Sequence, residues 1–124
     1  MVARVTHVLV AIAAAFFLAL GVFALLRPAA VLAPFGVAVG TADGRSEVSA
    51  VYGGFGLAMA VLLALAVPDP AAHRGELLAV AVALFGMAAG RIVARLRDRP
   101  RAFYPVWFFF WVEIAAGALL LLAR

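Results

Sequence analysis

Four apolar stretches are the feature of this sequence that most limits its fold, and they cover residues 5–26, 47–67, 75–97 and 105–123. A helix of about 20 residues crosses the ~30 Å hydrocarbon layer of a bilayer, so each stretch is long enough to span it. The rest of the chain is too short to surround four such helices with protein. We therefore expect four transmembrane helices rather than the buried helices of a soluble protein.

Composition agrees with this interpretation and excludes several kinds of chemistry. Apolar residues make up 69% of the chain and charged residues only 13%, which is unlike a small soluble domain. Cys, Lys, Asn and Gln are absent, so thiol redox chemistry, disulfides and Cys-ligated metal centres are excluded. No motif indicates a reaction. We expect no catalytic residue and no cofactor, and we favour a protein that is not an enzyme while leaving that question open.

The connections predict how the helices are arranged. Those around residues 68–75 and 97–104 are short, which favours antiparallel neighbours. The expected fold is all-α: one integral membrane domain over residues 1–124, built as an up-and-down four-helix bundle. The longer connection, 27–46, is predicted to lie in the membrane interface, with a re-entrant loop as the alternative. The first stretch exceeds the apolar core of a signal peptide, so we expect a retained helix.

Arginine asymmetry predicts the orientation, because cytoplasmic connections carry an excess of positive charge. With four spans, one side holds Arg27, Arg45, Arg95, Arg97, Arg99 and Arg101, and the other holds Arg4, Arg74 and Arg124. This count places both termini outside in a multi-pass protein of the cell inner membrane. The basic run from Arg95 to Arg101 is typical of contact with head groups, and we expect no nucleic-acid partner.

Two charged residues lie deep within the predicted helices, where an ionisable group costs about 2.5–3.5 kcal/mol. Arg91 is six residues from Arg97, or ~9 Å, and Glu113 is eight residues from Pro105, or ~12 Å, below the same surface. Arg91 could extend its side chain to the head groups, whereas Glu113 is too short to do so. Glu113 must be protonated or paired, and we predict a pair with Arg91.

Glu47 and Tyr52 are the other candidate site residues. Glu47 could join the Arg91–Glu113 pair, or it could have an ordinary role in the first helical turn next to Ser46 as N-cap. Tyr52 is a candidate hydrogen-bond donor. The four residues together could form a polar pocket for a lipid-like or small anionic ligand, or the charges could simply fix helix register.

Small residues indicate which helix faces meet, because membrane helices associate by close backbone approach. Gly86 and Gly90 form a GxxxG pattern, and Gly53, Gly54 and Gly56 offer a matching surface on the second helix. We expect packing within one chain, with a homodimer seam as the alternative.

Aromatic and histidine residues suggest no further site. The aromatic run from Phe103 to Trp111 is typical of an interfacial belt at a helix start. His7, His73 and Glu76 fall on the same predicted side, but they lack metal-ligand spacing on any one helix. We expect no metal site.

The stretch from Glu47 to Gly54, with Arg27-Pro28, Phe35-Gly36, Gly90-Arg91, Asp98 and Glu113, resembles a bacterial family of small four-helix membrane proteins of unknown function that is similar to the DoxX-like group. The resemblance covers nearly the whole chain and implies that these residues belong to a shared site or scaffold. The family pattern has Arg in the place of Ser49. Its absence here leaves Glu47 without a nearby cation on its own helix, which favours a contact with Arg91.

Three functions follow as hypotheses. The first is a bundle that binds a lipid-like or small anionic ligand at Arg91 and Glu113, with Glu47 and Tyr52 as further candidates. The second is an accessory subunit of a larger membrane complex, of a respiratory or redox kind by the DoxX-like resemblance. The third is a proton-coupled small transporter, which would need a dimer to form a path. The expected partners are the bilayer, a lipid-like ligand, and a second copy or another membrane subunit.

Overall fold

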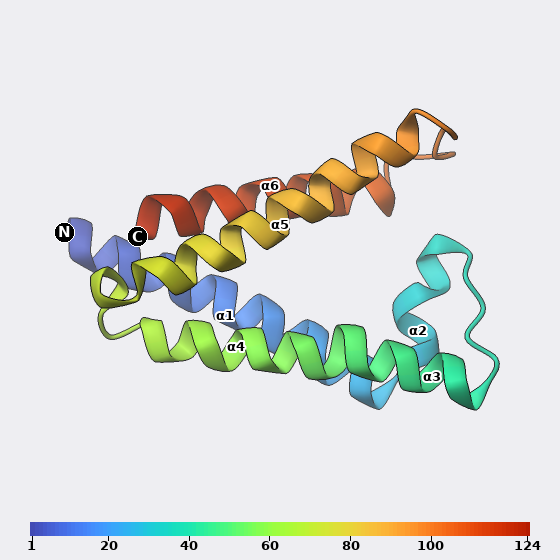
Figure 1. Ribbon diagram of the computed structural model, residues 1–124, viewed down its shortest axis with the longest axis horizontal. Coiled ribbons are helices and arrows are strands. Elements are labelled where there is room, and N and C mark those ends of the chain that lie inside the picture. The colour runs from blue at the N-terminus through green and yellow to red at the C-terminus, as the bar shows by residue number, and fades with distance from the viewer. The chain divides into compact units, whose positions relative to one another are not determined.

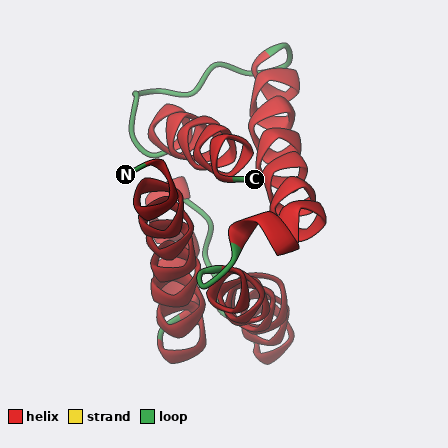
Figure 2. Cartoon of the chain, turned by 90° about the vertical axis from the view of Figure 1, so that its left-hand side faces the viewer, coloured by secondary structure: helices red, strands yellow, loops and turns green.

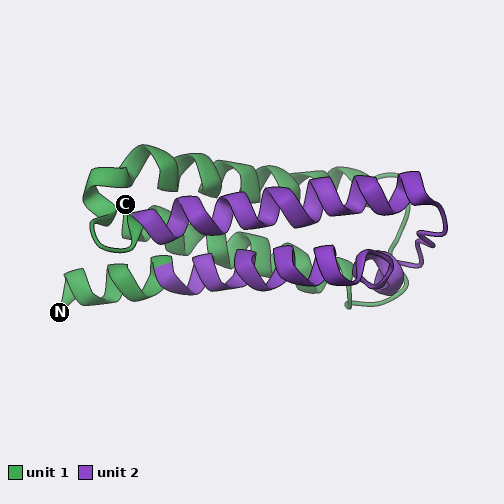
Figure 3. Cartoon of the chain, turned by 90° about the horizontal axis from the view of Figure 1, so that it is seen from below, with its two compact units in different colours: residues 1–10, 66–124 green, residues 11–65 purple.

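The computed structural model describes residues 1–124 as helices and connecting turns, and Figure 2 shows no strand. Four helical stretches are long and apolar enough to cross a membrane: Val2–Leu26, Ala42–Ala66, Pro70–Arg95 and Val106–Ala123. The predicted all-α fold with four membrane-spanning helices is confirmed, and the chain is a membrane protein by the length and composition of these helices. Its residues form two compact units, 11–65 in one and 1–10 with 66–124 in the other (Figure 3).

Residues 11–65, here called unit 2, contain most of α1 (Val2–Leu26) and the second span (Figure 1). The connection between them comprises α2 (Pro28–Leu32), η1 (Ala33–Phe35) and an extended segment over residues 37–40. The second span is made of α3 (Ala42–Val48), the π-helix η2 (Ser49–Gly54) and α4 (Phe55–Ala66).

Glycines allow the two long helices of unit 2 to approach closely. A Cβ added at Gly21 would lie 2.8 Å from the backbone nitrogen of Leu57 and 3.0 Å from the carbonyl oxygen of Gly53. A Cβ at Gly56 would lie 3.1 Å from the Cα of Gly21. Because these neighbours are backbone atoms, no side-chain movement could relieve the contact. Gly53 and Gly56 therefore face α1.

Residues 1–10 and 66–124, here called unit 1, contain η3 (Pro70–His73), α5 (Arg74–Arg95) and α6 (Val106–Ala123). The helices α5 and α6 pack against each other. The buried residues of α5 recur at three- and four-residue intervals, as expected for one helix face: Leu77, Val80, Ala81, Leu84 and Ala88. In the same stretch of this contact, a Cβ added at Gly117 would lie 2.9 Å from the ring of Phe85.

The start of the second span differs from the predicted one. Thr41, not Ser46, is the N-cap, because its hydroxyl oxygen accepts a hydrogen bond of 3.0 Å from the backbone N–H of Gly44. Ser46 and Glu47 consequently lie inside α3, and Asp43 is the acidic residue of the first turn. The expected first-turn role of Glu47 is therefore wrong. Much of the 27–46 connection is helical, and its depth in a membrane stays a prediction.

Candidate functional site

Arg91 on α5 and Glu113 on α6 lie side by side in unit 1. The Nη2 of Arg91 donates to Glu113 Oε1 at 2.7 Å, and its Nε donates to Oε2 at 2.9 Å and to Oε1 at 3.1 Å. Two nitrogens on one edge of the guanidinium thus donate to both carboxylate oxygens, which is the strong bidentate form of this interaction. The structure brings these two residues together as the matched depths predict.

Arg91 and Glu113 differ in how far their side chains are exposed to solvent. The side chain of Glu113 is 5% exposed, whereas that of Arg91 is 22% exposed. Phe109, one helical turn before Glu113, places its ring centroid 6.0 Å from the guanidinium carbon of Arg91. A cation at that distance from an aromatic face is attracted to it. Two residues on one face of α6 therefore hold Arg91, and Glu113 is the deeper charge.

The exposed part of Arg91 lies on a pocket of about 520 Å³ at the end of α5, here called the arginine pocket. Its lining comprises Met87, Gly90, Arg91, Ala94, Arg95, Asp98, Arg99, Pro100 and Val106. Arg91 and Arg95 are four residues apart and so share a helix face. The lining thus carries three positive groups against one negative group, with Glu113 behind Arg91. Guanidinium groups that line one pocket can bind phosphate and carboxylate oxygens there.

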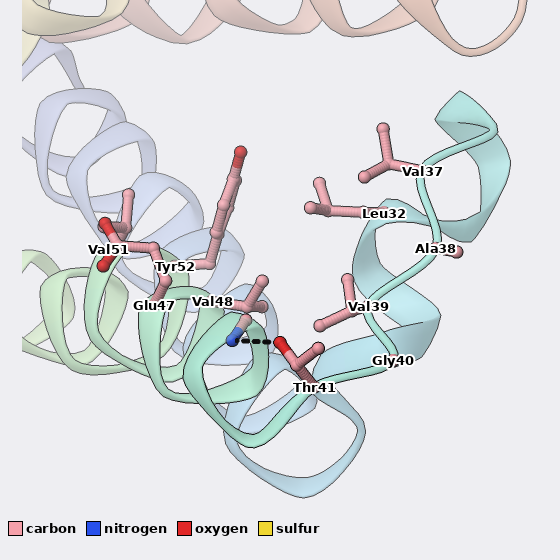
Figure 4. A pocket seen from close by; sticks show the side chains of 11 residues that line it. Leu32, Val37, Ala38, Val39, Gly40, Thr41, Glu47, Val48, Val51 and Tyr52 are labelled. Atoms are coloured by element: carbon pink, nitrogen blue, oxygen red, sulfur yellow. Dashed lines mark hydrogen bonds between the residues drawn. The ribbon is translucent and has the colours of Figure 1, made fainter.

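Glu47 and Tyr52 belong to unit 2, and they line a different pocket of about 450 Å³. This tyrosine pocket is formed by Leu32, residues 37–41 and Gly44 on one side and by Glu47, Val48, Val51 and Tyr52 on the other. All its residues come from the connection and the start of the second span (Figure 4). The proposed contact between Glu47 and Arg91 stays a prediction.

The π-helix η2, which contains Tyr52 and Gly53, is a feature that the sequence analysis missed. The backbone N–H of Phe55 donates to the carbonyl oxygen of Ala50, five residues back, and the Ser49 hydroxyl donates to the carbonyl oxygen of Arg45 at 2.8 Å. Single π-turns inside α-helices are frequent at functional sites. The adjacent Gly53-Gly54 pair, which weakens an α-helix, was the signal available for it.

The arginine pocket also includes two residues, Arg95 and Arg99, that the sequence assigns only to a basic run at a membrane surface. Asp98 lines the pocket as well, and it is one of the residues that the family resemblance implies for a shared site or scaffold. The four-residue spacing of Arg91 and Arg95 was the signal that could have joined the two arginines to the site.

The glycines and the histidines of the sequence analysis occupy different settings. Gly54 has only Ser49 of its own helix near its Cβ position, and nothing lies within 4 Å of that position at Gly86 or Gly90. The Nδ1 of His73 lies 3.3 Å from Glu76 Oε1, and no cluster of three metal-ligating side chains is present. His73 and Glu76 thus form a local pair one helical turn apart.

Comparisons with known proteins identify the family but no activity. No curated protein and no solved structure matches the chain. A family model described as a domain of unknown function, DUF4345, matches residues 5–124, which is nearly the whole chain. The protein therefore belongs to the DUF4345 family.

Proposed function

We propose that the protein binds an anionic ligand, a phospholipid head group or a small anion, in the arginine pocket. The observation that carries this proposal is the position of Arg91. One edge of its guanidinium is hydrogen-bonded to buried Glu113, and Arg91 lines a pocket that also contains Arg95 and Arg99. Glu113 acts as a positioning residue here, because it fixes the guanidinium without itself lining the pocket.

The location of the pocket favours an amphiphile. Arg95 is in the last turn of α5, where carbonyl groups give the helix end a partial negative charge that stabilises cations. Arg95 and Arg99 therefore have a reason to gather at this end, which is also where a membrane presents its head groups. Basic pockets between transmembrane helices bind phosphate-bearing head groups, and each Lys or Arg near the surface contributes about 1 kcal/mol.

Lipid retention in nanodiscs tests the proposal. The purified chain is placed in phosphatidylcholine nanodiscs with a minority of phosphatidylglycerol of the same acyl chains, and bound lipid is counted by native mass spectrometry. A second arm replaces phosphatidylglycerol with inorganic phosphate, which distinguishes a lipid from a free anion. We expect Arg95→Gln and Arg99→Gln each to lower phosphatidylglycerol retention about fivefold, the equivalent of about 1 kcal/mol.

Arg74→Gln is the matched control, because Arg74 is exposed at the opposite end of the same helix and is not part of the pocket. This variant should retain phosphatidylglycerol as the wild type does. Equal retention in all variants, or an equal fall in Arg74→Gln, would contradict the proposal and reduce the arginines to general surface charge. High salt should weaken the preference, because the pocket is open to solvent ions.

A second proposed function is an accessory role in a larger membrane complex, in line with the DoxX-like resemblance. It is supported by α5, where Gly86 and Gly90 are exposed with nothing within 4 Å of their Cβ positions. Small residues let another helix, from a second copy or a different subunit, approach closely. A stoichiometric partner that is lost when both glycines are changed to Leu would support this function. Purification of the chain alone from native membranes would contradict it.

We also propose that the protein lies in the bacterial inner membrane with both termini outside. The support is the excess of arginine at the first and third connections. Because the chain has no cysteine, single Cys variants report topology directly. Ala102→Cys should be protected from a membrane-impermeant maleimide in intact cells, and Ala71→Cys should react. The reverse pattern would invert the orientation.

A further inference from the structure

The tyrosine pocket of unit 2 plays no part in the proposed anion site, and it carries charge of the opposite sign. Glu47 is exposed at its rim, and neither the Glu47 carboxylate nor the Tyr52 hydroxyl makes a hydrogen bond or an ion pair with another side chain. A carboxylate within a membrane span is costly unless a cation accompanies it. Glu113 has Arg91 for this purpose, whereas Glu47 has no such neighbour in unit 2.

The opposite wall of the pocket is apolar. In Figure 4 the side chains of Leu32 and Val37, from α2 and the extended segment, point toward the ring of Tyr52. Val39 lies nearer to Val48 on the same wall. The ring of Tyr52 thus faces apolar side chains across the pocket, whereas the Glu47 carboxylate lies on the other side of Tyr52 and points away from that wall (Figure 4). An acid beside an apolar space suits a ligand with an apolar body and a positive end.

The extended segment also offers hydrogen-bond donors. Among residues 38–40, no backbone N–H group makes a backbone hydrogen bond. Backbone groups need partners wherever water is scarce, and oxygens of a ligand can supply them. Residues 38–40 line the pocket, so a ligand held there can supply acceptors for these N–H groups while its cation meets Glu47.

The depth of Glu47 matches that of a lipid head group. The second span, Ala42–Ala66, has 25 residues, so it is ~38 Å long and exceeds ~30 Å of hydrocarbon by ~8 Å. Glu47 lies five residues after Ala42, or ~8 Å along the helix. With Ala66 at the far edge of the hydrocarbon, the Glu47 carboxylate lies at the near boundary, where phospholipid head groups begin.

We propose that the tyrosine pocket binds a phospholipid whose head group carries a primary ammonium. The ammonium donates to the Glu47 carboxylate, and the phosphate and ester oxygens accept from the Tyr52 hydroxyl and from the backbone N–H groups of residues 38–40. The upper part of an acyl chain packs on Leu32 and Val37. The π-helix widens the helical turn that presents Tyr52, and it stands between Glu47 and α4.

Competition between two lipids of equal net charge tests this site independently of the arginine pocket. The full chain is placed in nanodiscs of phosphatidylethanolamine and phosphatidylcholine with the same acyl chains, and retained lipid is counted by native mass spectrometry. The quaternary ammonium of phosphatidylcholine cannot donate a hydrogen bond. We expect the wild type to prefer phosphatidylethanolamine about tenfold, the size of one charge-assisted hydrogen bond.

Variants of the two polar residues should act differently. Glu47→Gln should abolish the preference, Glu47→Asp should retain part of it, and Asp43→Asn should retain it fully because Asp43 is exposed on the same helix outside the pocket. Tyr52→Phe should lower retention of both lipids about fivefold without changing the preference, because the phosphate is common to both. Circular dichroism of each variant shows that the helices are intact.

Two results would overturn the proposal. One is an absence of preference in the wild type, and the other is an equal loss of preference in Asp43→Asn and Glu47→Gln, which would indicate general charge rather than a site. Neither result bears on phosphatidylglycerol retention, so failure here and failure of the proposed anion site are separable.

Discussion

Replacing Arg91 by Ala removes the guanidinium from a carboxylate that is 5% exposed. Three N–H to oxygen contacts of 2.7–3.1 Å are lost, and the charge of Glu113 stays between α5 and α6. Removing one partner of a buried ion pair costs about 3–5 kcal/mol. Since Arg91 is 22% exposed and water can reach its place, we expect the lower end, about 3 kcal/mol.

The double variant Arg91→Ala with Glu113→Gln should lose less, about 1–2 kcal/mol, because a neutral amide with incomplete hydrogen bonds costs less than a lone buried carboxylate. Glu113→Gln alone should resemble the double variant, since the long side chain of Arg91 can turn toward the head groups. The order of the three variants in free energy of unfolding therefore depends on which of the two charges is buried.

Reversible unfolding in mixed micelles measures these differences, with SDS as the denaturant and helix content followed by circular dichroism. Arg95→Ala is the control, because Arg95 lies one turn farther on the same helix and is not paired with Glu113. It should change the free energy of unfolding by less than about 1 kcal/mol. Equal losses for Arg91→Ala and the double variant would refute the reasoning, since Glu113 would then tolerate its surroundings without a cation.

Three further changes test the packing in the same unfolding assay. Gly117→Ala should cost about 1–3 kcal/mol, because the new Cβ would lie 2.9 Å from the ring of Phe85, and the added change Phe85→Leu should restore part of the loss. Gly21→Ala should cost more than Gly90→Ala, since its Cβ would lie 2.8 Å from the backbone of α4, whereas Gly90 has open space; similar losses would mean that a neighbour covers α5 at Gly90. Thr41→Ala should cost about 1 kcal/mol and speed amide exchange at Gly44, and unchanged exchange would contradict its role as N-cap.

The spans could be predicted from the sequence because their length and apolar character depend on the bilayer alone. The first and last residues of the spans could not be predicted with the same accuracy. Ser46 and Thr41 are both good N-cap residues, and only the backbone geometry before Ala42 decides that Thr41 meets the N–H of Gly44. Ser46 is the hydroxyl residue nearest the apolar stretch, so the sequence predicts a helix start there. The polar residues of α3 carry little hydrophobic signal that could extend the helix back to Ala42.

The Arg91–Glu113 pair of the candidate site could be predicted by counting residues from the connection between the two helices. Arg91 and Glu113 have matching depths on neighbouring antiparallel helices, so counting residues from the connection was sufficient to bring them together. Counting could not reveal the arginine pocket, since Asp98 and Arg99 lie beyond the end of α5, where the course of the chain depends on the connection itself. It could not reveal η2 either, because a π-turn changes the hydrogen-bond register without changing which residues are apolar.

The two carboxylates Glu47 and Glu113 show why burial is more informative than residue type. Glu113 is buried, and both of its carboxylate oxygens accept hydrogen bonds from Arg91. Its role is therefore to position Arg91. Glu47 is exposed near the start of its span, where a head group can approach it. A buried charge needs its partner within the protein, whereas a charge at the boundary can take its partner from the membrane. If lipid binding fails at Glu47 but persists at Arg95 and Arg99, the membrane supplies anions to this protein and water alone accompanies Glu47.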